Sequence, residues 1–195
     1  MSQILEVPVS QRFHDALTYA STLHSTQGRK GTTIPYVAHL LAVASIVMEA
    51  GGSEDEAIAA LLHDGPEDQG GEKTLAEIRT RFGDAVADIV SNCSDTFEDP
   101  KPAWAERKRK YREHLRSADI GTLLVSCADK LHNARATLRD LRDQGPSVWS
   151  KFSGTREQTL GNYAGLIEVY ESATPDPRRT GIARELRDIV AQMGQ

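Results

Sequence analysis

Residues 61–68 read Leu61-Leu62-His63-Asp64-Gly65-Pro66-Glu67-Asp68, and this stretch is the most informative part of the chain. A histidine–aspartate pair is followed three residues later by a glutamate–aspartate pair, directly after an apolar run. Four ionisable side chains this close to an apolar segment are atypical of a solvated surface. An imidazole and a carboxylate can share one divalent cation, and a second acidic pair nearby can exchange protons with water. The stretch therefore predicts metal-assisted hydrolysis.

The segment that leads into this stretch carries a helix start signal. Ser53 and Glu56 form the capping-box pattern, and Ala57 to Leu62 supply a buried face. Pro66 cannot continue that helix without losing a hydrogen bond, so we expect the helix to end or kink near Asp64. The acidic pair that follows then lies at a break, where it can point into a cavity.

Apolar residues recur at helical spacing along most of the chain. Phe13 to Leu23 and Val37 to Met48 each form an apolar stripe, and Gly51-Gly52 ends the second segment. A further short helix is predicted to begin at Thr74. The same spacing predicts five more helices, over Ala85 to Cys93, Trp104 to Ser117, Ile120 to Leu141, Arg156 to Glu171 and Ile182 to Met193. A loop is predicted from Asp95 to Pro102. Strand patterns are almost absent. We expect one all-α domain over residues 1–195, with its core at about 12–172 and its C-terminal helix at about 178–194.

Composition and charge limit the classes of protein to consider. Apolar residues make up 39% of the 195 residues and charged residues 26%, as in a globular domain. The formal net charge of −5 argues against nucleic-acid binding. An anionic ligand would therefore have to be held by a local cluster of basic residues.

The chain shows no sign of export or of a membrane span. Cys93 and Cys127 fit neither a zinc-ligand spacing nor a disulfide framework, so we expect reduced, buried thiols. Residues 1–6 lack the pattern of a secretory signal, and the apolar stretch from Val37 to Met48 is too short to cross a bilayer. These features predict a cytoplasmic protein without membrane contact.

Four residues are candidates for one metal site. His39 lies on the apolar stripe of its helix, His63 and Asp64 end the next helix, and Asp129 lies in an apolar helix start. Singly, each has an ordinary alternative, such as a core histidine or a capping aspartate. One cation would satisfy all four otherwise costly buried groups. A nitrogen–oxygen set without thiolates suits Mn²⁺, Fe²⁺ or Mg²⁺ better than structural zinc.

Together these motifs resemble the HD-domain superfamily of phosphohydrolases. Within it the chain is similar to the hydrolase domain of RelA/SpoT-type stringent-response enzymes and to stand-alone small alarmone hydrolases. The resemblance covers about Phe13 to Tyr170 and is carried by Arg29-Lys30-Gly31, Pro35-Tyr36-Val37-Ala38-His39, residues 63–68 and Ala128-Asp129-Lys130-Leu131-His132-Asn133. It implies a helical bundle with a metal site at its centre.

The resemblance also assigns roles to individual residues. It implies that His39, His63, Asp64 and Asp129 bind Mn²⁺ and that Glu67 and Asp68 are the catalytic acidic pair. The matching substrate-binding residues are Arg29, Lys30, Asn133 and Tyr163. Two departures affect the substrate side. Gly65-Pro66 stands where the family more often has β-branched residues, and Ala136 replaces a small hydroxyl residue.

Other motifs are interpreted as structural. Residues 107–110 are all basic and are followed by Arg112, but helical spacing spreads these side chains round more than half of a helix. One or two of them at most can face the site, with Lys108 and Arg112 as candidates. Trp104, Trp149 and Phe152 are interpreted as core or subunit contacts, and His132 as an ordinary histidine.

The expected function is removal of the 3′-pyrophosphate from (p)ppGpp or from the adenine counterpart (p)ppApp. The expected partner is a small nucleotide, with no nucleic acid, and the C-terminal amphipathic helix suggests a homodimer. Two alternatives stay open. Another HD-type nucleotidase would use the same metal ligands without needing the grip of Arg29 and Lys30. A non-catalytic nucleotide sensor would bind without turnover.

Overall fold

The helices of this protein follow closely from its local sequence signals. The computed structural model describes residues 9–96 and 102–195. Residues 1–6, where no secretory signal is expected, lie outside the described residues. Most of the loop expected from Asp95 to Pro102 lies outside them as well. The elements are α1 (Gln11–Leu23), α2 (Val37–Glu49), α3 (Glu54–Leu62), α4 (Gly65–Asp68), α5 (Gly71–Phe82), α6 (Asp84–Cys93), α7 (Trp104–Leu115), α8 (Ile120–Gln144), η1 (Gly145–Lys151), α9 (Arg156–Ser172) and α10 (Pro177–Met193).

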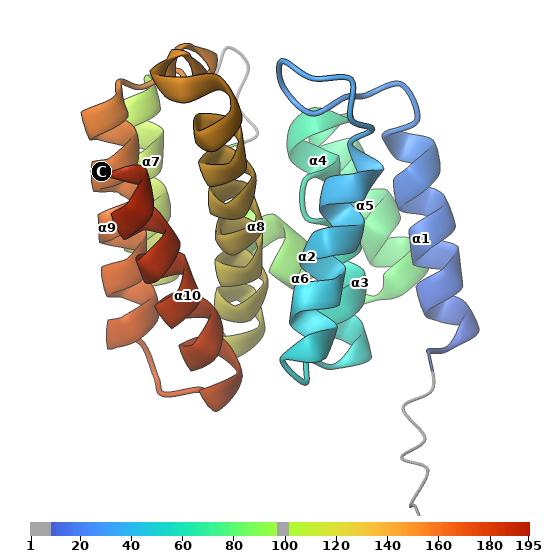
Figure 1. Ribbon diagram of the computed structural model, residues 1–195. Helices are drawn as coiled ribbons and strands as arrows, with labels where there is room; N and C mark the ends of the chain where they lie inside the picture. The colour runs from blue at the N-terminus through green and yellow to red at the C-terminus, as the bar shows by residue number, and fades with distance from the viewer. Residues whose placement is uncertain (1–8, 97–101) are drawn as a thin grey trace, which may run out of the picture.

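Helix α8 is the central element. It packs against α2, α3 and α6 on one side and against α9 and α10 on the other (Figure 1). Its first half is buried on every face from Gly121 to Asp129. Asp119 caps its start, because the carboxylate accepts a hydrogen bond of 2.9 Å from the backbone N–H of Thr122. The all-α class is confirmed, since the described residues contain no strand.

The predicted capping box at the start of α3 is present. Ser53 Oγ accepts from the backbone N–H of Glu56, and Glu56 Oε2 accepts from the backbone N–H of Ser53 at 2.6 Å. Glu56 also pairs with Arg178 at 2.9 Å, which ties α3 to the start of α10. Glu56 therefore both caps α3 and links it to α10.

Several helix boundaries differ from the sequence prediction, among them the end of α8, which lies at Gln144 rather than Leu141. Helix α5 begins at Gly71 rather than Thr74, because Gly70 adopts a left-handed φ of 108° and ends the preceding turn. The hydroxyl of Thr74 donates back to the carbonyl of Gln69 instead of capping a helix. Helix α10 begins at Pro177, next to the start expected near residue 178 and ahead of the apolar periodicity that begins at Ile182, since Asp176 caps it and proline suits a first helical position. Helix α7 ends at Leu115, two residues before the predicted Ser117.

The apolar face of α10 is buried within the same chain. Ile182, Leu186 and Ile189 are at most 8% exposed and lie on a helix that packs against α8 and α9. This face is therefore not available to a second subunit, which removes the reason for expecting a homodimer. None of the helices in the described ranges has the length and apolar character of a bilayer span. Neither cysteine forms a disulfide, and Cys127 is buried as expected while Cys93 is only partly so.

The turn between α2 and α3 gives a test of this packing. A Cβ atom at Gly52 would lie 2.5 Å from Val47 Cγ1 and 2.8 Å from the Val47 carbonyl oxygen. We predict that Gly52→Ala lowers the free energy of unfolding by about 1–3 kcal/mol in urea titrations. Gly161→Ala is the control, because that Cβ meets nothing within 4 Å on α9 and should stabilise by about 1 kcal/mol. Equal effects of the two variants would contradict the packing described here.

Candidate metal centre and the cavity beside it

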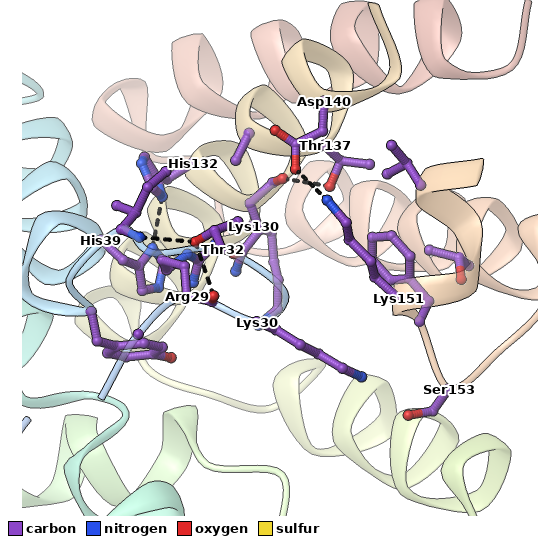
Figure 2. Close-up of a pocket in the computed structure, with 18 of the residues that line it drawn as sticks. Arg29, Lys30, Thr32, His39, Lys130, His132, Thr137, Asp140, Lys151 and Ser153 are labelled. Atoms are coloured by element: carbon purple, nitrogen blue, oxygen red, sulfur yellow. Dashed lines mark hydrogen bonds and ion pairs between the residues drawn. The ribbon is translucent and has the colours of Figure 1, made fainter. Parts of the chain in front are cut away.

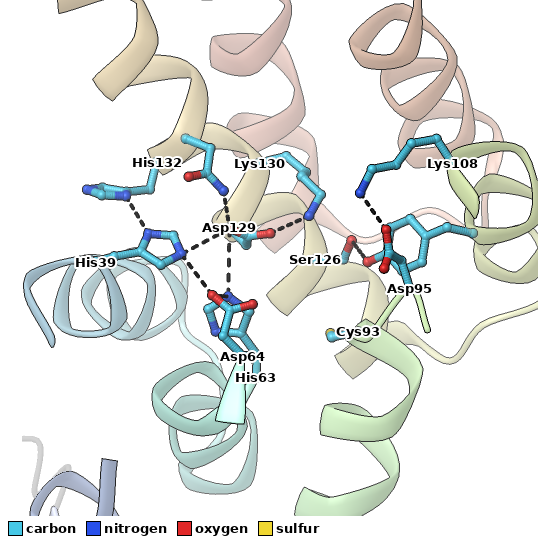
Figure 3. Close-up of polar contacts among 12 residues, drawn as sticks. His39, His63, Asp64, Cys93, Asp95, Lys108, Ser126, Asp129, Lys130 and His132 are labelled. Carbon is cyan, nitrogen blue, oxygen red and sulfur yellow. Dashed lines mark hydrogen bonds and ion pairs between the residues drawn. The ribbon is translucent and has the colours of Figure 1, made fainter. Parts of the chain in front are cut away.

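The structure brings the four predicted metal ligands together from three helices. His39 comes from α2, His63 and Asp64 from the end of α3, and Asp129 from α8 (Figure 3). His39 Nε2 lies 3.2 Å from Asp129 Oδ1 and 3.5 Å from Asp64 Oδ2. His63 Nε2 lies 3.1 Å from the same Asp64 oxygen and 3.7 Å from the same Asp129 oxygen. Two imidazoles and two carboxylates therefore point at one position.

The chemistry of this group fits a divalent cation. Metal–ligand bonds of roughly 2.0–2.2 Å place neighbouring ligand atoms roughly 3 Å apart, which is close to the separations seen here. The ligand atoms of His39, His63 and Asp129 all lie within 4.8 Å of one another, and all three side chains are buried. The Nε2 atoms of both histidines are buried without a hydrogen-bond partner. Such orphaned polar atoms are costly unless something binds them.

Neighbouring groups hold both imidazoles in a ligand-ready orientation. His63 Nδ1 donates to the Ala60 carbonyl oxygen at 2.9 Å, which leaves the lone pair on Nε2. His39 Nδ1 lies 2.7 Å from His132 Nδ1. Burial is the main cause that lowers the pKa of His132 to about 4. A neutral His132 can accept a hydrogen bond from the Nδ1–H group of His39, which leaves the lone pair of His39 at Nε2.

The two carboxylates are oriented in the same way. Tyr36 donates its hydroxyl proton to Asp64 Oδ2 at 2.5 Å. Asn133 and Lys130 donate to the two oxygens of Asp129. Burial opposes the charge on Asp129, but Lys130 and the adjacent imidazoles outweigh it and hold the pKa of that carboxyl well below its usual range. Asp129 is therefore an anionic oxygen donor at neutral pH.

The protonation of His63 shows how strongly this position attracts positive charge. Burial disfavours the imidazolium form, but the carboxylates of Asp64 and Asp129 outweigh it and raise the pKa of His63 well above its usual value. The same imidazole raises the acidity of Asp64, whose pKa lies well below its usual range despite burial. A proton and a metal cation are alternative ways to neutralise the same two carboxylates.

A cavity of about 820 Å³ opens beside the metal group, with His39 in its wall (Figure 2). Seven basic side chains and three carboxylates line it, although the whole chain is acidic. The basic ones are Arg29, Lys30, Arg107, Lys108, Lys130, Arg139 and Lys151. All six predicted catalytic and substrate-binding residues are also in its wall, namely Arg29, Lys30, Glu67, Asp68, Asn133 and Tyr163. The local basic cluster expected for an anionic ligand is therefore present.

The acidic pair occupies its own short helix. Helix α3 ends at Leu62, near Asp64 as predicted, and Pro66 then lies in the first turn of a new short helix, α4. Glu67 is half-buried, whereas Asp68 is exposed. Asp68 Oδ2 accepts a hydrogen bond of 2.7 Å from the side-chain amide of Gln27. Both face the cavity next to the metal group.

The predicted basic loop is linked to the metal group through Asn133. Arg29 Nη2 donates to Asn133 Oδ1 at 2.5 Å, and the amide of Asn133 donates to Asp129. The loop closes on itself, because the backbone N–H of Arg29 donates to the Ile34 carbonyl at 2.8 Å. Lys30 is exposed beside it. Arg29 therefore reaches the site in a fixed position.

The opposite wall is basic as well, which the sequence indicated only in part. Arg107 and Lys108 line the cavity, and Asp95 pairs with both at 2.7 and 2.6 Å. Asp95 has a side chain that is only 4% exposed, so it holds two cations in the wall. Arg109 and Lys110 pair with glutamates on the exposed face of α7, as expected.

Several residues of the site were not identified by sequence reasoning. Arg112 does not line the cavity and binds Asn162 instead. His132, Lys130 and Lys151 were given no role, although the spacing of three residues between Asp129 and His132 places both on one helical face. Trp104 and Phe152, expected as core or subunit contacts, are half-buried in the cavity wall. Trp104 begins α7 and Phe152 directly follows η1, so only the tertiary fold brings the two rings to one cavity.

Comparisons with known proteins match this geometry. A family model described as HD domain matches residues 16–160. Over 140 residues the chain is 40% identical to guanosine-3′,5′-bis(diphosphate) 3′-pyrophosphohydrolase MESH1 of Xenopus tropicalis, covering 70% of this chain and 73% of the relative. Over 136 residues it is 36% identical to the bifunctional (p)ppGpp synthase/hydrolase SpoT of Escherichia coli K12, covering 68% of this chain and 19% of SpoT.

A solved structure extends the likeness to the whole fold. It is described as a metazoan ortholog of SpoT that hydrolyses ppGpp and plays a role in starvation responses. The TM-score is 0.75 at 28% identity, covering 95% of this chain and 97% of that chain. A protein of Listeria monocytogenes EGD-e aligns with a TM-score of 0.66 at 34% identity, covering 78% of this chain and 99% of its own. The chain therefore belongs to the HD-domain family, in which it resembles the MESH1 and SpoT hydrolases.

Proposed function

We propose that this protein is a metal-dependent hydrolase that removes the pyrophosphate group from the ribose 3′ position of (p)ppGpp. The observation that carries the proposal is a buried imidazole–carboxylate group in the wall of a cation-rich cavity, in a chain with a net charge of −5. A nucleotide with phosphates at both ends of its ribose needs this concentration of positive charge. The names of the relatives MESH1 and SpoT support the same substrate. The adenine counterpart (p)ppApp would undergo the same chemistry.

The proposed cofactor is Mn²⁺, with Fe²⁺ and Mg²⁺ as alternatives, held by His39, His63, Asp64 and Asp129. Mixed imidazole and carboxylate ligands without thiolates suit these ions. When bound, the cation supplies a Lewis acid that activates water and polarises a phosphate oxygen. Each proposed ligand already has a second partner that fixes its orientation, which favours a preformed site.

Glu67 is the proposed general base. It is half-buried in the cavity wall and can take a proton from the attacking water. Asp68, held by Gln27, positions that water. Attack on the proximal phosphorus breaks its bond to the ribose 3′ oxygen, which takes up a proton as pyrophosphate leaves. The remaining product is a 5′-phosphorylated nucleoside.

The cations and Tyr163 are proposed to hold the substrate. Arg29 and Lys30 contact phosphate oxygens from the loop, and Arg107 and Lys108 do so from the opposite wall. Asn133 contacts the sugar and phosphate region. Burial raises the pKa of Tyr163 to about 12, so its hydroxyl stays protonated and can donate a hydrogen bond to the ligand at neutral pH. We also propose a cytoplasmic location, consistent with free cysteines.

Glu67→Gln tests the proton-transfer role. The amide keeps the size of the side chain but cannot take a proton, so kcat for pyrophosphate release from ppGpp should fall by about 10²-fold or more. Metal content, measured by inductively coupled plasma mass spectrometry, should stay unchanged. Glu72→Gln, an exposed glutamate at the start of α5, is the matched control. A Glu67→Gln enzyme with normal kcat would refute the assignment.

Asp64→Ala tests the metal site. Removal of one anionic ligand should abolish both metal retention and turnover, because the two imidazoles and one remaining carboxylate bind the ion more weakly. Metal content and pyrophosphate release are measured after reconstitution with Mn²⁺, Fe²⁺ or Mg²⁺, and Mn²⁺ should give the highest rate. Asp143→Ala on the exposed side of α8 is the control. An Asp64→Ala protein that keeps stoichiometric metal and activity contradicts the ligand set.

Lys108→Ala tests the phosphate grip of the wall opposite the basic loop. Loss of one charge-assisted hydrogen bond, worth about 1.5–3 kcal/mol, should raise KM for ppGpp by about tenfold or more. Lys110→Ala is the control, since Lys110 pairs with Glu106 on the exposed face of the same helix. If both variants raise KM equally, general electrostatic attraction rather than a built contact is responsible.

A further inference from the structure

We infer that Asp140 and Lys151 read the base of the nucleotide and select guanine over adenine, an inference that rests on the proposed function. Both side chains line the cavity beside the metal group, and Figure 2 shows them side by side in its wall. Lys151 Nζ lies 3.3 Å from Asp140 Oδ2. No step of the proposed hydrolysis uses this pair.

The position of Asp140 along α8 fits a base rather than a phosphate. Asp129, Asn133 and Asp140 follow one another at spacings of four and seven residues, so they share one face of the helix. At a rise of 1.5 Å per residue, Asp140 lies about 16 Å along the axis from Asp129. That separation suits a nucleotide whose 3′-phosphate lies at the metal group and whose base points away from it. The stripe from Asp129 to Asp140 therefore runs the length of the ligand.

The pair is held in place before any ligand binds. The side chains of Asp140 and Lys151 are 17% and 22% exposed. Lys151 also donates to Gln144 Oε1 at 3.2 Å, and its aliphatic stem would lie 3.5 Å from a Cβ atom at Gly31. Asp140 Oδ1 accepts from Arg139 at 3.2 Å. A carboxylate acceptor and an ammonium donor are thus presented side by side at fixed positions.

The donors and acceptors of guanine match this arrangement. On its Watson–Crick edge, guanine presents the O6 acceptor next to two N–H donors, N1–H and the N2 amino group. Two adjacent donors fit the two oxygens of Asp140, and Lys151 can donate to O6. Adenine offers one amino donor and the N1 acceptor, so it can satisfy only one oxygen of Asp140. Guanine therefore gains one hydrogen bond more than adenine.

The walls at this end suit the flat faces of a purine. Val148 is buried in the cavity wall, and Phe152 lies beside it with its ring 5.6 Å from that of Trp149. Trp104 lines the cavity from α7. Ala136, which lies between Asn133 and Asp140 on α8, adds no polar group. Asp140 and Lys151 form an ion pair in this part of the wall and are therefore the groups assigned to polar recognition of the base.

Equilibrium binding of GDP and ADP, the nucleotide products of ppGpp and ppApp, and of IDP tests base selection without requiring turnover. The wild-type protein should bind GDP about tenfold or more tightly than ADP by calorimetry, since a bidentate contact to a base is worth about 1–3 kcal/mol. IDP, which lacks the amino group at N2, should fall between them. Asp140→Asn should remove or reverse the preference, because an amide can donate to N1 of adenine while accepting from its amino group.

Asp143→Asn, a substitution on the exposed side of α8, is the matched control and should keep the wild-type preference. Equal affinities for GDP and ADP in the wild-type protein would overturn the inference, as would no measurable binding of either. An Asp140→Asn protein that loses both nucleotides in equal proportion would show that the pair only tethers η1 to α8, which also overturns it. Pyrophosphate release from ppGpp and ppApp is followed in parallel. Absence of release with an intact preference for GDP would reject the proposed hydrolysis and leave base selection standing.

Discussion

The structure depends on two buried imidazoles that face two carboxylates at one position, where the Nε2 atom of neither histidine has a hydrogen-bond partner. His39 and His63 are each at most 2% exposed, and their Nε2 atoms have no hydrogen-bond partner. Leaving such groups unsatisfied costs free energy that the rest of the core would have to offset. A divalent cation removes that cost, so the same arrangement that burdens folding provides a binding site. Metal affinity and fold stability are thereby linked.

Helix α8 connects this centre to the rest of the cavity. Its buried first half places Asp129 among α2 and α3, and its next turns carry Asn133 and Asp140 along the cavity wall. Asn133 links Asp129 to Arg29 in the basic loop. On the opposite wall Asp95 fixes Arg107 and Lys108. An acidic protein thus concentrates positive charge where an anionic ligand would bind, while its remaining surface stays repulsive to polyanions.

Features that depend on local sequence were predictable. The capping box of Ser53 and Glu56 and the end of α3 near Asp64 both follow from side chains within a few residues. The convergence of His39, His63 and Asp129 was also predictable, because polar residues on apolar helical faces need a common partner. The start of α5 was misplaced, because the left-handed turn at Gly70 allows the helix to begin at Gly71, ahead of Thr74.

Other parts of the site depend on contacts between distant segments, which no local pattern reveals. Lys151 reaches the cavity because η1 packs against α8, where Lys151 pairs with Asp140. The guanidinium of Arg107 is held in the cavity wall by its ion pair with Asp95. His132 has no identifiable partner until α2 packs against α8 and brings His39 within 2.7 Å. The amphipathic pattern of α10 suggests a dimer surface, whereas α8 and α9 cover its apolar face within the chain.

The most direct test of the central claim is the anomalous diffraction of crystals grown with manganese. One strong peak is predicted between α2, α3 and α8, with His39 Nε2, His63 Nε2 and carboxylate oxygens of Asp64 and Asp129 within about 2.0–2.3 Å of it. A well-ordered crystal in which these four side chains turn away from one another, or in which manganese binds elsewhere, would contradict the account.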